Sequence, residues 1–170
     1  MFDLVKSLVF ILITFFLLNS VSASERKYNL GKVALKTEVA GWDIDVRPDG
    51  KGAPKGKGNA IKGEEIYAEA CASCHGDFGE GIDRWPELIG GQNSLDTHDP
   101  IKTTGSYWPY ASTIYDYIYR AMPFGAAQSL SYDETYQIVA YLLYMNEIIE
   151  EDFVLSDKNI GKIKMPNRNG

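Results

Sequence analysis

Two cysteines and one histidine are the residues whose types and spacing could do chemistry in this chain. They stand together in the segment Cys71-Ala-Ser-Cys74-His75, and no other cysteine occurs among the 170 residues. Two thiols three positions apart near the end of a helix can form thioethers with the two vinyl groups of one porphyrin, and the adjacent imidazole can then bind the iron. The segment therefore predicts one covalently attached haem c, with Cys71 and Cys74 as its attachment points and His75 as an iron ligand.

Two other kinds of site use the same residue types. A redox-active dithiol of the thioredoxin kind also has two cysteines at this spacing. It requires a strand–helix–strand setting, however, and the sequence around Cys71 shows none. A zinc site would need two further ligands nearby, and His98 is the only other histidine in the sequence. Haem attachment is thus the favoured interpretation.

The iron needs a sixth ligand or an open position, and four side chains outside the motif could provide a ligand. Met122 precedes Pro123, which disfavours a helical conformation of the residue before it, so the thioether would be presented from a loop. Met145 lies among apolar residues of a predicted helix, which is typical of core packing. We expect Met165, in a polar tail, and His98, in a polar loop, to be exposed. Met122 is therefore the predicted sixth ligand, and methionine–histidine ligation raises the reduction potential relative to bis-histidine ligation.

Other residues could support the haem less directly. A proximal histidine usually donates its second ring N–H to a carbonyl, and Trp85-Pro86 follows His75 at a distance where a loop could return past the imidazole. Four side chains could bind the haem propionates, or could equally be ordinary packing or surface residues: Arg84, Tyr107, Trp108 and Tyr110.

Three helices are predicted to position these residues, at about 61–72, 112–121 and 132–150. The second has apolar residues at i, i+3, i+4 and i+7, the spacing of one helix face. The third begins with Ser131-Tyr-Asp-Glu134, a capping box in which the serine side chain accepts from the backbone and the glutamate reaches back. No strand pattern of comparable strength occurs in the sequence. The expected fold class is all-α.

The flanking segments differ from the helical region in composition and charge. Residues 1–23 combine one lysine, an apolar run and small residues at the end, which indicates a signal peptide. The uncharged stretch is shorter than the roughly 20 residues that span a bilayer, so we expect cleavage, export to the periplasm and no membrane attachment afterwards. Residues 24–60 form an extended basic arm of net charge +3, 61–150 a haem domain of −10, and 151–170 a C-terminal tail of +1. This acidic balance is poorly suited to nucleic-acid binding.

The arm raises a question about one tryptophan. Its glycine- and proline-rich part, residues 47–58, can be neither a helix nor a central strand, so it is expected to be a linker or to lie along the surface. Trp42 is a large apolar residue in this polar arm. It could pack on the haem domain, or it could anchor in a pocket of a partner, as interface tryptophans often do.

The arrangement of these features resembles the class I cytochrome c fold over about residues 61–150. The shared features are the cysteine–histidine motif at the end of a first helix, a Met-Pro loop 47 residues later and a final amphipathic helix. In that family the first and last helices cross. The resemblance implies that Gly63 and Tyr67 lie against the helix that bears Tyr141 and Tyr144.

A narrower resemblance spans most of the chain after the signal segment. Five stretches are similar to the cytochrome subunit of the sulfane dehydrogenase of the Sox sulfur-oxidising system: 41–50, 71–81, 105–111, 121–125 and 151–157. In that family the cytochrome partners a molybdenum-cofactor subunit that oxidises sulfane sulfur on a carrier protein, and the haem takes the electrons away. Members can carry a second haem domain, whereas this sequence has one attachment motif.

Together these features predict a periplasmic monohaem cytochrome that accepts electrons from a molybdenum-dependent sulfur-compound dehydrogenase and passes them to another cytochrome or an oxidase. Sulfane and sulfite both remain possible substrates of the enzyme, since sulfite dehydrogenases also use small monohaem subunits. The chain would have no catalytic residues of its own, because the chemistry belongs to the cofactor. Two alternatives are a freely diffusing electron shuttle without a dedicated enzyme, and a haem sensor or peroxidase-like enzyme in which Met122 leaves the iron open.

Overall fold

The computed structural model describes residue 28 and residues 30–170. The predicted signal peptide, 1–23, lies outside the described residues. The chain divides into two compact units, residues 1–39 and 40–170, and the second contains most of the described structure. In the part of the chain that the structure describes, every helix is too short or too polar to cross a membrane.

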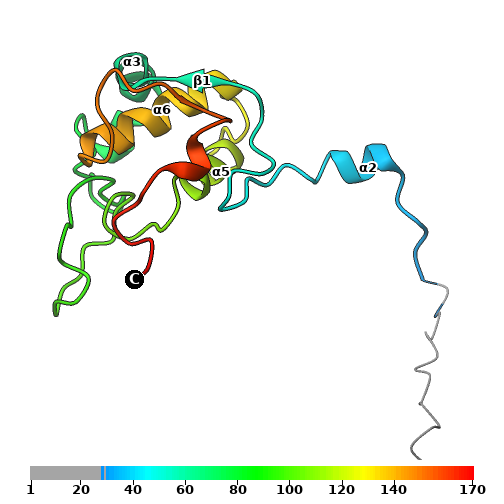
Figure 1. The fold of residues 1–170 in the computed structure, drawn as a ribbon, viewed down its shortest axis with the longest axis horizontal. Helices are drawn as coiled ribbons and strands as arrows, with labels where there is room; N and C mark the ends of the chain where they lie inside the picture. Colours follow the sequence, from blue (N-terminus) through cyan, green and yellow to red (C-terminus); the bar gives the residue numbers. More distant parts are fainter. Residues whose placement is uncertain (1–27, 29) are drawn as a thin grey trace, which may run out of the picture. The chain divides into compact units, whose positions relative to one another are not determined.

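Helices dominate the second unit, as predicted (Figure 1). The three long ones are α3 (Ala60–Ala70), α5 (Ala111–Ala121) and α6 (Tyr132–Met145), each beginning or ending close to its predicted boundary except for the end of α6. The shorter elements are α2 (Lys36–Ala40), α4 (Ala72–His75), the 3-10 helix η1 (Ile160–Lys162) and the paired strands β1 (Lys57–Gly58) and β2 (Leu155–Ser156).

The crossing of α3 and α6 forms the centre of the core. Gly63 lies at the contact, where an added Cβ would collide with the carbonyl oxygen of Gln137 and with Tyr141. The rings of Tyr67 and Tyr141 lie 5.1 Å apart between their centroids, and Tyr67 is buried. Close approach at a glycine lets the two helices pack backbone to backbone. The crossing implied by the class I resemblance is therefore present.

The helix α6 ends at Met145, earlier than the predicted 150. The backbone N–H of Ile148 donates to Leu143 O at 2.9 Å and that of Glu147 donates to Tyr144 O at 2.8 Å, a Schellman closure. Glu147 has φ 59° at the left-handed position where glycine is usual. The capping box at the other end is present as predicted, with Ser131 and Glu134 exchanging hydrogen bonds.

Part of the predicted arm belongs to the body. The buried Val46 donates its N–H to Asp116 Oδ1 at 2.8 Å, and the Tyr136 hydroxyl donates to Pro54 O at 2.9 Å. Residues 45–58 thus follow the surface of α5 and α6, and the compact unit begins at Ala40, before the predicted boundary at 61. Hydrogen bonds between the backbone of this segment and side chains of the helices hold it in place. Such bonds produce no periodic pattern in the sequence.

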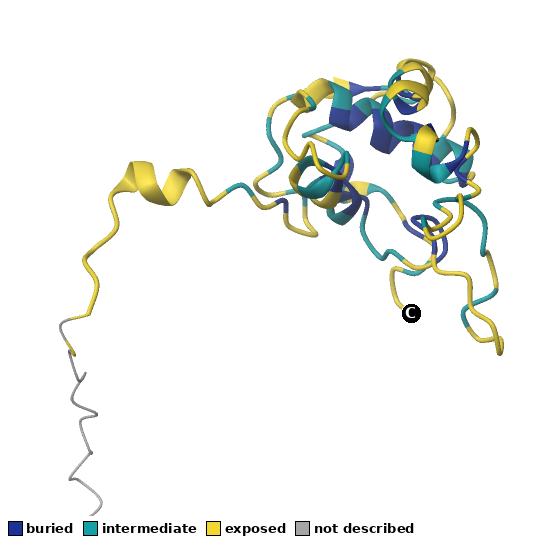
Figure 2. Cartoon of the chain, turned by 180° about the vertical axis from the view of Figure 1, so that it is seen from behind, coloured by how far each residue is buried: buried dark blue, intermediate teal, exposed yellow. Residues whose placement is uncertain are grey.

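The predicted tail also contributes to the core. Leu155, Ile160 and Met165 are buried, and Met165 is only 3% exposed. Figure 2 shows the buried residues of the chain in dark blue, many of them on helices. The expectation that Met165 is exposed was therefore wrong. Leu155 ends a short apolar run, whereas Ile160 and Met165 each stand alone among polar residues, glycine and proline. The segment therefore has neither a helical nor a strand pattern, although three of its side chains are buried.

A buried amide fastens the long loop before α5 to the end of α6. The Asn146 Nδ2 group lies 2.8–3.2 Å from three acceptors, on Leu142, Leu88 and Thr104, and Asn146 Oδ1 accepts from the N–H of Gly90 at 3.2 Å. Buried polar groups of this kind are stable only when they are hydrogen-bonded. Asn146 thus fixes a loop that has no helix or strand of its own.

Candidate haem site

The attachment motif lies where one helix ends and a single turn follows it. Cys71 is the C-terminal cap of α3, its N–H donating to Tyr67 O at 2.9 Å, and Cys74 and His75 lie in the turn α4. The N–H of His75 donates to Cys71 O at 2.9 Å, which holds the three residues within one helical turn. Both cysteines are half-buried free thiols.

The imidazole of His75 is oriented by the loop that follows it. Its Nδ1 lies 2.9 Å from Pro86 O, which confirms the carbonyl predicted near Trp85-Pro86. A carbonyl oxygen can only accept, so Nδ1 carries the proton and Nε2 keeps its lone pair. The Trp85 ring lies edge-on, 6.4 Å from the imidazole centroid. The site therefore fixes the tautomer that a metal ligand needs.

Tyr67 holds the turn after the motif. Its hydroxyl donates to Gly76 O at 3.0 Å, and Gly76 has φ 84°, with the Glu80 side chain where a Cβ would lie. Burial, together with nearby Cys71, raises the pKa of the Tyr67 hydroxyl above its ordinary value, so the group stays protonated at neutral pH and remains a donor. The turn thus depends on a buried donor and on a glycine with no side chain.

Met122 occupies the place predicted for a loop-presented thioether. It is the C-terminal cap of α5, with the extended backbone angles φ −119° and ψ 151°, and it is half-buried against the core. Two residues later, the ring of Phe124 packs 5.4 Å from the ring of Trp85, which in turn neighbours His75. The structure therefore brings the methionine loop and the histidine loop together through one tryptophan.

The other candidate ligands lie elsewhere. The side chain of His98 is 98% exposed and pairs with Asp99 at 3.2 Å, so the prediction of a solvated loop histidine is confirmed. Met145 is half-buried at the end of α6 and packs on the core, as predicted. Met165, in the C-terminal tail, is buried in the hydrophobic core. None of these three is tied to His75 by a described contact.

The candidate propionate-binding residues separate into two groups. The Arg84 guanidinium lies 4.8 Å over the ring of Trp85, beside the site. The other three side chains have partners elsewhere. The Arg168 guanidinium lies 4.4 Å over the Tyr110 ring, Lys102 Nζ lies 5.5 Å over the Tyr107 ring, and the Trp108 ring packs 5.5 Å from that of Tyr117. Sequence reasoning could not separate them, since all four are donors in similar loop surroundings.

The chemistry of these groups suits haem c better than a redox dithiol. Burial, and secondarily Cys74, raises the pKa of the Cys71 thiol to about 11, so it is protonated at neutral pH. A redox dithiol requires an accessible thiolate of low pKa. Two thiols, an imidazole with a free Nε2 and a thioether at a helix end form the donor set that haem c uses, and Cys71 and Met122 of this set pack against the apolar core.

The fold and these residues define a c-type cytochrome, with covalently bound haem c as its cofactor. Residues 58–142 match the family model described as "Cytochrome C oxidase, cbb3-type, subunit III". The match covers half of the chain, and the chain therefore belongs to this family of cytochrome domains.

Two similar proteins extend the comparison. The crystal structure of the sulfane dehydrogenase SoxCD from Paracoccus pantotrophus contains a chain that is 53% identical, with a TM-score of 0.79. That match covers 85% of this chain and 71% of the other, so it includes flanking segments as well as the haem domain. The thiosulfate dehydrogenase of Stutzerimonas stutzeri (strain A1501) is 33% identical over 94 residues, or 52% of this chain. This chain spans only 28% of that enzyme.

Proposed function

We propose that this cytochrome is the electron-accepting subunit of a molybdenum-dependent dehydrogenase of sulfur compounds and works in the periplasm. It accepts electrons one at a time and passes them to a downstream cytochrome or oxidase. The observation that carries the proposal is the 53% identity over 85% of the chain to a subunit of a sulfane dehydrogenase. Such a match beyond the haem domain supports a shared partner, since flanking segments are not needed to hold a haem.

Four residues would hold the cofactor in this proposal. The Cys71 and Cys74 sulfurs would form the thioethers, and His75 Nε2 and the Met122 thioether would bind the iron. When bound, the haem supplies a reversible one-electron change of its iron. The chain orients the imidazole through Pro86 O and packs Cys71 and Met122 against the apolar core. Apolar surroundings that limit access of water to a metal site influence its reduction potential.

The segment before the body supports a dedicated partner over a freely diffusing shuttle. Trp42 is 89% exposed, so it is not part of the cytochrome's own core. The preceding residues expose further apolar side chains at Tyr28, Leu30, Val33, Leu35 and Val39. Several exposed apolar residues in one short segment are typical of a protein interaction site. A shuttle that meets its partners only briefly does not need one.

The test is reduction of the purified complex by defined sulfur compounds. The tagged holocytochrome is isolated from periplasmic extract of the source cells, its molybdenum content is measured, and sulfite or a sulfane-loaded carrier protein is added. We expect stoichiometric molybdenum and haem reduction by one of the two compounds, which also identifies the substrate. A complex without molybdenum whose haem is reduced by neither compound would contradict the proposal and favour the shuttle.

A further inference from the structure

Basic residues from two distant parts of the sequence gather in the unit 40–170. Residues 45–58 contain four bases and two acids, and residues 157–168 contain four bases and one acid. Residues 59–156 contain four bases and 16 acids. The unit therefore combines two segments of joint net charge +5, which we call the basic face, with an intervening remainder, residues 59–156, of net charge −12. Such a division of charge produces a strong field across a small molecule.

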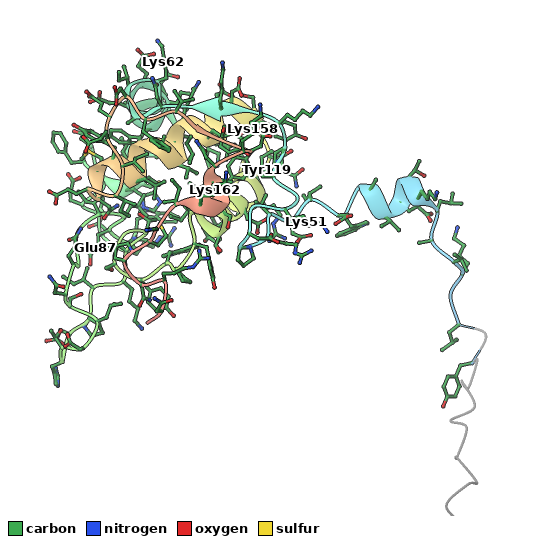
Figure 3. All side chains as sticks on the ribbon, in the orientation of Figure 1. Lys51, Lys62, Glu87, Tyr119, Lys158 and Lys162 are labelled. Atoms are coloured by element: carbon green, nitrogen blue, oxygen red, sulfur yellow. The ribbon has the colours of Figure 1, made fainter. Side chains whose placement is uncertain are left out.

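The fold places the two segments of the basic face side by side. The strands β1 and β2 pair with Lys57 opposite Ser156. Farther along, the backbone at Gly161 lies so close to Asp49 and Gly50 that a Cβ there would collide with the Asp49 carbonyl. Figure 3 shows Lys51, Lys158 and Lys162 projecting from this region, with Lys62 of α3 apart from them.

The lysines of the basic face are exposed, and none of them forms an ion pair with another described residue. Six of them contribute, Lys51, Lys55 and Lys57 from the first segment and Lys158, Lys162 and Lys164 from the second. The ion pairs found among the described residues join other side chains, on the segment before the body, on α3, on α5 and in the His98 loop. Positive charges without a partner among the described residues remain available to another molecule.

The second segment is held in a fixed shape. Residues 161–169 curve around a hollow of about 560 Å³ that is lined in part by Lys162, Lys164 and Arg168. The hydrogen bond of Asn167 to Tyr107 O and the stacking of Arg168 on Tyr110 fasten this curve to the loop before α5. A preorganised charged surface loses less conformational freedom when it binds a partner.

We propose that the basic face docks an acidic surface of a protein with which the cytochrome exchanges electrons. This inference rests on the proposed function only in that the partner is a redox protein. An anionic membrane fits less well, because it would repel the remainder of net charge −12 while attracting the face. Carboxylates of Asp45, Asp49 and Asp157 also lie among the bases, and such alternation favours a partner with a charge pattern of its own.

The test measures binding of the mature holocytochrome to poly-L-glutamate, which mimics an acidic protein surface, at low salt. Two variants neutralise one segment each, Lys158→Gln with Lys162→Gln, and Lys51→Gln with Lys55→Gln. The control Lys62→Glu changes the net charge by the same two charges away from the face. We expect each double variant to bind roughly 2- to 30-fold more weakly, the range for two lost exposed ion pairs, and the control to bind as tightly as the unchanged protein.

Several outcomes would overturn the proposal. Equal weakening by Lys62→Glu would mean that only the net charge matters, and weakening by one double variant alone would mean that the two segments do not act as one face. Binding to vesicles of phosphatidylglycerol but not to poly-L-glutamate would assign the face to a membrane. The assay needs neither the dehydrogenase nor a sulfur compound, so its failure is distinct from failure of the proposed function.

Discussion

The hydrogen bond between His75 Nδ1 and Pro86 O has effects beyond orientation. A carbonyl that accepts from one nitrogen raises the basicity of the other, so Nε2 becomes a stronger donor to a metal. Trp85 precedes that carbonyl and packs on both His75 and Phe124. Two adjacent residues of one loop, Trp85 and Pro86, therefore orient the imidazole from the side of its Nδ1 atom and ring edge.

Met122→Ala is the residue-scale prediction for the sixth ligand. Attachment depends on the two cysteines, so the haem should stay bound while one iron position opens. We expect the reduction potential to fall by on the order of 0.1 V or more, within the roughly 0.8 V that axial ligands span. Redox titration measures the fall, and a Soret shift on adding carbon monoxide to the reduced variant detects the open position.

Met145→Ala is the matched control, because this methionine packs at the end of α6. Its potential and its response to carbon monoxide should equal those of the unchanged protein. If the unchanged protein itself bound carbon monoxide readily, the sensor or peroxidase-like alternative would replace the assignment of Met122.

The start of α6 can be predicted from the sequence, whereas its end cannot. The start has Ser131 and Glu134 in a capping-box pattern, and the structure confirms it. The end has no glycine to mark the left-handed residue, since Glu147 occupies that position. Apolar residues continue to Ile149, so a reading by apolar pattern alone extends the helix too far. The backbone closure, which no side chain encodes, decides the boundary.

The capping box gives a pH-dependent prediction. Hydrogen bonds with the Ser131 side chain and backbone lower the pKa of Glu134. A lowered folded-state pKa stabilises the fold above the ordinary value of about 4.3, and this contribution is lost as the pH falls through the lowered pKa. Glu134→Gln should therefore be less stable than the unchanged protein near pH 7, by about 0.3–1 kcal/mol, with the difference shrinking towards pH 3. Urea unfolding across this range measures it, and a pH-independent difference would refute the assignment.

Asn146→Ala is expected to be far more damaging than its polar residue type suggests. The substitution leaves acceptors on Leu88 and Thr104 and the N–H of Gly90 with one partner fewer in the protein interior. Losing a buried network of this kind should cost about 2–4 kcal/mol of unfolding free energy. Thermal or urea unfolding measures the loss. The exposed Gln92→Ala, in the same loop, serves as a control that should change stability little.

At the scale of the whole molecule, Trp42 connects stability to partner binding. Because its side chain is 89% exposed, Trp42→Ala should leave the melting temperature and the potential of the isolated cytochrome nearly unchanged. If Trp42 anchors in the dehydrogenase, electron delivery should slow at low partner concentration, since truncation of an interface tryptophan often costs about 2 kcal/mol or more. Stopped-flow haem reduction against partner concentration, beside a thermal melt, measures both.

The exposed Val154 supplies a control, as Val154→Ala removes apolar surface from the body instead. It should affect neither the delivery rate nor the potential. A large loss of melting temperature in Trp42→Ala with normal delivery would show that the tryptophan belongs to the cytochrome's own core.

The segments that could be predicted from the sequence are those with a periodic apolar pattern or with a motif of defined residue spacing. The motif at Cys71, the extended Met122 before proline and the three helices all have such signals, and the structure contains each of them. Residues 45–58 and 155–165 gave no such signal, because single apolar side chains and side chain–backbone hydrogen bonds hold them. The basic face could not be predicted either, because its two segments are far apart in the sequence and lie side by side only in the folded chain.

The burial of Leu155, Ile160 and Met165 bears on the order of maturation. Haem must reach both cysteine sulfurs, and these are half-buried once the chain is folded. The side chains that complete the core follow the attachment motif in the sequence, so they are synthesised after it. We therefore expect haem attachment to precede the packing of residues 155–165 against the core.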